Sequence, residues 1–239
     1  MLDKLPTSRR WRIRLKGLDR DLEDLAECLQ GSTRVFKEDG AYFLESELLS
    51  ELLDDGSSPT LYQQAKDFLR VISGVERVRR AIAEPVELNA LYWKDSGTTW
   101  GQVLGDTVTL TFFSNIVRLS DSGVFERSVE LALGDEQVRM NLNDFLGEWD
   151  FPRLRRIAES IFIDVGAGDV KRGVQEVIDR GWVSAQDCAL FRDTVNYGDG
   201  KTLGAHSRLK RSPVQNPMNI IQAGEFLGGI FAKWIESKI

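Results

Sequence analysis

Near its N-terminus the chain alternates between apolar and cationic residues. A two-residue period is typical of a β-strand with one face in the core and the other in solvent. The alternation predicts a strand that turns its cations outward in a row. The apolar positions are Trp11, Ile13 and Leu15, and the cationic ones are Arg10, Arg12, Arg14 and Lys16.

Further strand and helix patterns alternate through the rest of the first half. Asp39-Gly40 stands between two short strand patterns and predicts a tight hairpin turn. Pro59 and Thr60 suit the start of a helix. We therefore expect an antiparallel or mixed sheet with two helices on one face. The expected helices are 19–29 and 60–73, and the expected strands are 10–16, 34–37, 41–45, 86–93, 99–104 and 107–113.

From about residue 120 onward only helix patterns remain. Asn216-Pro217 predicts the start of the last helix, with a capping residue followed by proline in the first turn. The change predicts an α+β protein with a sheet-containing domain, 1–118, and a helical domain, 119–239. The expected helices are 123–133, 136–147, 151–163, 169–180, 185–196 and 217–237.

Composition narrows the class of protein. The 239 residues are 42% hydrophobic and carry a formal net charge of −6, so the surface as a whole does not attract polyanions. No stretch is apolar enough for a signal peptide or a membrane span, and the two cysteines form no disulfide framework. These features predict a cytoplasmic protein that does not contact membranes.

Several catalytic and cofactor chemistries find little support in the sequence. One histidine and two distant cysteines disfavour zinc, and no metal or other cofactor is expected. Gly166-Ala167-Gly168 suggests a phosphate loop, but Lys171 occupies the position of the third glycine. We interpret Gly166 as a helix end and Asp169 as the cap of the next helix. Glu126 and Glu130 share a helix face, where solvated surface residues are the simpler interpretation.

The row of cations in strand 10–16 has two interpretations. Cations spaced about 7 Å apart on one face of a strand can follow a nucleic-acid backbone, which makes Arg10, Arg12 and Arg14 candidate binding residues. The alternative, which the sequence favours, is structural. The cations would then protect an edge strand or pair with nearby acidic side chains.

A second basic group lies in the segment between Asn196 and Asn216, which shows no apolar period. Long irregular loops in compact domains are often functional. His206, the only histidine, is the side chain there whose ordinary pKa of about 6.5 suits acid–base chemistry. The alternative is a solvated loop without a role. The cationic residues of the segment are Lys201, Arg208, Lys210 and Arg211.

The last helix contains small residues at positions that permit close helix approach, namely Gly224, Gly228 and Gly229. Packing against a helix of the same chain is the simplest explanation. A homodimer formed through this C-terminal helix is the alternative.

The C-terminal block resembles that of a group of uncharacterised bacterial proteins. Their pattern has an Arg-His pair, and Ala205 stands here in place of the arginine. Any role for that arginine would pass to Arg208. The matching residues are Gly181, Trp182, Ser184, Phe191, Thr194, Val195, Asn196, Gly198, Asp199, His206, Pro213, Asn216, Pro217, Met218 and Trp234.

The helical half is also loosely similar to HEPN domains, which cut RNA with an Arg and a His four to six residues apart. Five residues after Arg192 stands Tyr197, and His206 lies further along. The resemblance therefore implies a non-catalytic version of such a domain.

Two functions follow from these observations. The first is a binding or regulatory protein that contacts RNA or a partner protein through the basic loop 199–211. The alternative is a metal-independent ribonuclease in which His206 acts as general acid or base and Arg208 or Lys201 stabilises the charge of the phosphorane, with Asn196 as a further candidate catalytic residue.

Overall fold

A computed structural model describes most of the chain. Three sequence predictions fall outside the described residues: the strand 107–113, the domain boundary, and the long loop with His206. The described ranges are 10–53, 58–80, 86–94, 101–103, 122–197 and 216–239.

The strands of these ranges form one antiparallel sheet with the order β2-β3-β1-β4-β5. The predicted hairpin at Asp39-Gly40 is confirmed, with φ of 50° and 76°, both in the left-handed region that a type I′ turn requires. The strand 10–16 is also confirmed, but it lies in the middle of the sheet, so its predicted role as a protected edge is wrong. The strands are β1 (Arg10–Lys16), β2 (Thr33–Glu38), β3 (Ala41–Ser46), β4 (Glu87–Lys94) and β5 (Gly101–Val103).

Three helices accompany this sheet: α1 (Asp19–Cys28), α2 (Glu47–Leu53) and α3 (Ser58–Arg80). When α2 and β5 are left out, the elements follow one another along the chain as β1, α1, β2, β3, α3 and β4. This order is the split βαβ arrangement, in which two helices cross one face of an antiparallel sheet. The sequence analysis missed α2, whose seven residues directly follow a strand. It also ended α3 at residue 73, although the helix continues for seven more residues.

The second half is helical, as predicted. The expected Gly166 helix end and the Asp169 cap are both confirmed, and the Asp169 carboxylate accepts a hydrogen bond from Arg172 N. The predicted Asn216 cap is wrong, because Asn219 caps the last helix in a capping box with Gln222. The helices are α4 (Ser122–Gly134), α5 (Glu136–Leu146), α6 (Phe151–Val165), α7 (Val170–Asp179), α8 (Ala185–Tyr197) and α9 (Ile220–Glu236).

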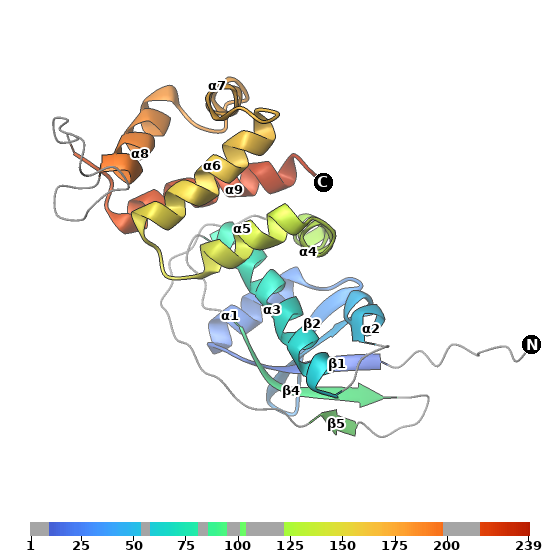
Figure 1. Ribbon diagram of the computed structural model, residues 1–239. Coiled ribbons are helices and arrows are strands. Elements are labelled where there is room, and N and C mark those ends of the chain that lie inside the picture. Colours follow the sequence, from blue (N-terminus) through green and yellow to red (C-terminus); the bar gives the residue numbers. More distant parts are fainter. Residues whose placement is uncertain (1–9, 54–57, 81–85, 95–100, 104–121, 198–215) are drawn as a thin grey trace, which may run out of the picture.

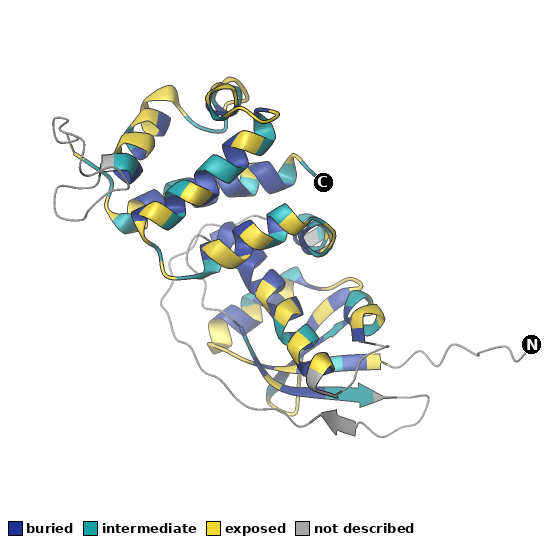
Figure 2. Ribbon diagram, viewed as in Figure 1, coloured by how far each residue is buried: buried dark blue, intermediate teal, exposed yellow. Residues whose placement is uncertain are grey.

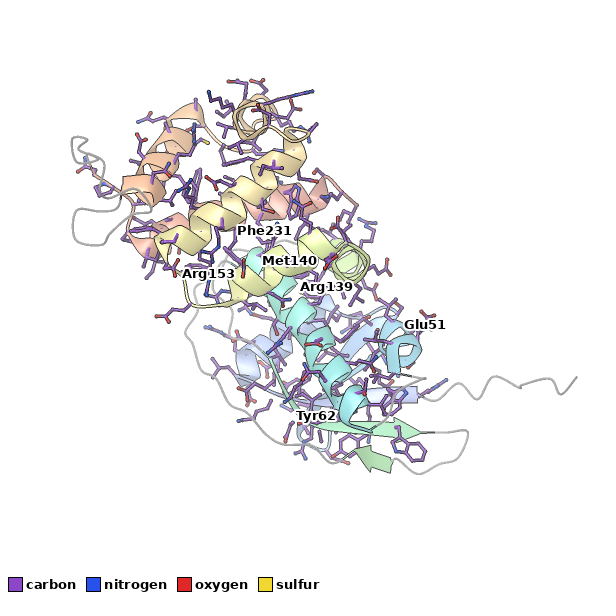
Figure 3. All side chains as sticks on the ribbon, viewed as in Figure 1. Glu51, Tyr62, Arg139, Met140, Arg153 and Phe231 are labelled. Atoms are coloured by element: carbon purple, nitrogen blue, oxygen red, sulfur yellow. The ribbon has the colours of Figure 1, made fainter. Side chains whose placement is uncertain are left out.

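The elements are arranged in successive layers (Figure 1). The sheet is covered by α1 and α3, then α4, α5 and α9 pack on α3, and α6 to α8 lie beyond them. In Figure 2 buried and exposed residues alternate along the outer helices, as expected of amphipathic helices that have one buried and one exposed face. One hydrophobic core extends from Ile13 in the sheet to Phe231 of α9, which Figure 3 shows in the interior of the helical half.

Buried charges join α1 to α3. The Arg80 side chain is 2% exposed, and its guanidinium lies 3.1 Å from the Asp21 carboxylate, 2.7 Å from Asp24 and 3.2 Å from Glu76. Charges out of contact with water are tolerated only when they are paired in this way. The cluster therefore fixes how α1 lies against α3.

Arg80→Ala should lower the free energy of unfolding by about 3–5 kcal/mol, because three carboxylates would lose their buried partner. Arg70→Ala is the matched control, since Arg70 on the same helix pairs with Asp67 in solvent and such pairs contribute about 1 kcal/mol or less. Urea unfolding followed by circular dichroism measures both. Equal losses in the two variants would contradict the structural role of the cluster.

The glycines of α9 do not share one role. A Cβ at Gly224 would overlap the ring of Trp149, whereas a Cβ at Gly229 would meet nothing within 4 Å. Gly224 therefore permits close packing within the chain, but against Trp149 between α5 and α6 and not, as the sequence predicted, against a helix. The homodimer alternative remains a prediction.

Gly224→Ala should destabilise the protein, because the added methyl group overlaps Trp149 and overpacking costs about 1–3 kcal/mol. Gly229→Ala should leave stability unchanged or raise it by up to about 1 kcal/mol, through the higher helix propensity of alanine. Thermal unfolding of the two variants tests this difference. A Gly224→Ala protein as stable as Gly229→Ala would refute the packing role.

Candidate nucleic-acid interface

The outward face of the sheet carries the predicted row of cations. Residues directly opposite each other in an antiparallel pair share a face, so Arg12 lies beside Glu45 of β3 and Tyr92 of β4. Arg14 lies beside Phe43 in the same way. We call this surface the arginine–aromatic face. The register places on it Arg10, Arg12, Arg14, Lys16, Arg34, Phe36, Glu38, Phe43, Glu45, Glu87 and Tyr92.

Arg12 occupies the centre of this face. Its guanidinium carbon lies 4.5 Å from the ring centroid of Phe43 and 5.5 Å from that of Tyr92. Its Nη1 also donates to Glu38 Oε2 at 2.6 Å. These contacts hold the guanidinium over the two rings by cation–π attraction and by an ion pair. The predicted pairing of this row with acidic side chains is therefore confirmed for Arg12.

Aromatic rings cross the face from β2 to β4. The Phe36 and Phe43 rings are stacked with centroids 6.0 Å apart, and the Phe43 and Tyr92 centroids are 6.2 Å apart. The Arg34 guanidinium lies 5.3 Å from the Phe36 ring. Phe36 and Tyr92 are half-buried, so neither residue is closed to solvent. The sequence analysis did not single out these rings, because only the strand register brings them together.

The charges on the face do not cancel. Glu45 pairs with Arg34 at 2.6 Å and Glu87 pairs with Lys16 at 3.3 Å. Arg10 and Arg14 are exposed, and neither forms an ion pair with another described residue. Among the side chains that the structure describes on this face, five cations and three carboxylates leave a local positive excess on a protein whose formal net charge is −6.

The structure does not bring the other predicted site residues to this face. Asn196 belongs to α8, at the far end of the molecule in Figure 1. Its Oδ1 is buried and accepts no hydrogen bond from the described residues. Thr194 Oγ1 accepts a hydrogen bond from Met218 N at 3.2 Å, which holds the end of α8 beside the approach to α9. The remaining predicted residues, Lys201, His206, Arg208, Lys210 and Arg211, lie outside the described ranges.

Other candidate groups have structural roles. Glu126 accepts hydrogen bonds from Thr33 N at 2.7 Å and Ser32 Oγ at 3.0 Å, and so ties α4 to the sheet. Burial raises the pKa of both thiols, Cys28 despite the nearby Arg79, so each is held protonated. Within the described ranges no three His, Cys, Asp or Glu side chains are grouped to hold a metal ion.

The described helices include none with the length and apolar character required to cross a membrane. Comparisons with protein-family models, with curated proteins and with solved structures gave no match. The resemblances of the C-terminal block therefore remain predictions, and a function can be inferred only from the geometry of the arginine–aromatic face.

Proposed function

We propose that this protein binds single-stranded RNA on the arginine–aromatic face, as a binding protein without catalytic activity. The observation that carries the proposal is the combination of exposed Arg10 and Arg14 with the half-buried rings of Phe36 and Tyr92. Cations attract the phosphate backbone, and aromatic or guanidinium planes stack on bases that are free of a duplex.

The position of β1 supports this proposal. Its outward residues lie in the centre of the sheet, so a strand of RNA laid across them also meets β3 on one side and β4 on the other. Arg10 and Arg14 lie on the same face two pleats apart and can contact separate phosphates. The ribonuclease alternative has no comparable support among the described residues.

Neutralising Arg10 and Arg14, which form no ion pair with the described residues, should weaken binding to a 12-nucleotide single-stranded RNA by about tenfold, because two charge-assisted phosphate contacts are lost. The slope of log K against log salt should fall by about 1.4, since each single-strand phosphate contact contributes about 0.7. Fluorescence anisotropy of the Arg10→Ala/Arg14→Ala variant across a salt series measures both quantities.

The matched control is Arg156→Ala/Arg172→Ala, which removes two exposed arginines from α6 and α7. It should keep the affinity and the salt slope of the unmodified protein. Equal losses of affinity in the two variants would show that net charge alone accounts for the effect. The face would then be rejected as the binding surface.

Stacking is tested separately at Tyr92. Tyr92→Leu should cost about 1–3 kcal/mol of binding free energy, because leucine fills space without offering a ring to a base. Tyr92→Phe keeps the ring and should bind RNA as the unmodified protein does. Unaltered binding by the leucine variant, with the melting temperature preserved, would exclude stacking at this position.

A further inference from the structure

A polar pocket opens where the arginine–aromatic face meets α2. Its volume is about 610 Å³, within the range of small-molecule sites. Arg10 and Arg34 belong both to the pocket and to the face, so the two are continuous. On the opposite side the pocket is lined by Glu47 and Glu51 of α2. Figure 3 shows Glu51 on the outer side of α2.

Some charged groups of this pocket already form ion pairs within the protein, and others do not. Arg34 and Glu45 form an ion pair at 2.6 Å and make a fixed part of the wall. The carboxylates of Glu47 and Glu51 are exposed, and no described residue donates a hydrogen bond to them or pairs with them. Arg10 is likewise without an ion pair to the described residues. The pocket therefore offers two acceptor groups and one donor group to a ligand.

The indole of Trp11 forms part of the same wall. Trp11 is 2% exposed and lines the pocket, and its Nε1–H is buried without an acceptor among the described residues. A buried N–H without a partner is unfavourable and rare in folded proteins. Because Nε1 is closed to solvent, a ligand in the pocket contacts other atoms of the indole and not this N–H.

We infer that the pocket holds a guanine base of the bound RNA, an inference that rests on the proposed function. The Watson–Crick edge of guanine presents two adjacent donors, N1–H and the N2 amino group, which match the two oxygens of one carboxylate. Its O6 and N7 are acceptors that an arginine recognises, and the five N–H donors of Arg10 allow its guanidinium to contact them as well as a phosphate. Adenine, cytosine and uracil each present a single donor group on the Watson–Crick edge, and the position beside it is an acceptor that a carboxylate repels.

The test compares two 12-nucleotide RNAs by fluorescence anisotropy, one of uridines only and one with a single central guanosine. The unmodified protein should prefer the guanosine-containing RNA by roughly 5- to 150-fold, the discrimination expected of a paired base contact. Replacement of the guanosine by inosine, which lacks the N2 amino group, should remove much of this preference. Glu47→Gln/Glu51→Gln should bring the ratio of the two dissociation constants close to one.

The matched control is Glu136→Gln/Glu225→Gln, which neutralises two exposed carboxylates on α5 and α9. It should keep the full preference for guanosine. An unmodified protein without this preference, or a Glu47→Gln/Glu51→Gln protein that keeps it, would overturn the assignment of the pocket.

The two proposals fail in different ways. If Arg10→Ala/Arg14→Ala weakens binding of every RNA but no base preference exists, RNA binding stands and the guanine pocket is rejected. A titration with guanosine monophosphate tests whether the pocket binds guanine even if the protein binds no RNA. If no RNA binds but the mononucleotide binds and Glu47→Gln/Glu51→Gln abolishes that binding, the pocket stands and the RNA proposal is rejected. Binding of neither ligand overturns both.

Discussion

The structure depends on a helix whose second half is buried on every side. Residues 71–78 of α3 are all buried, between the sheet on one side and α4, α5 and α9 on the other. A helix in this position must partner each polar side chain it carries. Ser73 Oγ accepts from Val86 N at 3.1 Å, and Glu76 binds Arg79 and Arg80. Elements of both halves of the chain pack against this helix.

Arg77 shows the same constraint on the opposite side of α3. Its Nη1 donates to Leu146 O at 2.5 Å, and its guanidinium carbon lies 4.7 Å from the Trp149 ring. Burial lowers its pKa to about 10, which still leaves the side chain charged near neutrality. Gly74 lets α5 approach, since a Cβ there would lie 2.9 Å from Leu142 Cβ. The helical half is thus fitted to α3 by polar and steric contacts together.

The sequence predicted what is encoded locally. The alternation in strand 10–16, the turn at Asp39-Gly40 and the Asp169 cap each depend on a few neighbouring residues, and all three are confirmed. The end of α3 was missed because residues 74–80 contain a glycine and four charged residues, which on an isolated helix indicate solvent. Their burial depends on partners such as Asp21, 59 residues away from Arg80 in the chain.

The candidate site likewise combines features that neighbouring residues encode with features that depend on distant parts of the chain. Local alternation was enough to put the arginines of β1 on one face, but their neighbours come from strands far apart in the sequence. Phe43 and Tyr92 stand 49 positions apart, and only the sheet register places both beside Arg12. The edge-strand interpretation failed for this reason, because strand order in a sheet is not a local property.

The carboxylates on the arginine–aromatic face determine what kind of binding it can support. Glu38 and Glu45 hold Arg12 and Arg34 against aromatic rings, which orients the guanidinium planes but cancels their charge. Attraction to phosphates over a Debye length of about 8 Å therefore comes mainly from Arg10 and Arg14. In an acidic protein, a face with only two cations that form no ion pair with the described residues binds a bare backbone weakly. Stacking on oriented planes and contacts to base edges must then supply most of its affinity, which favours selective over general RNA binding.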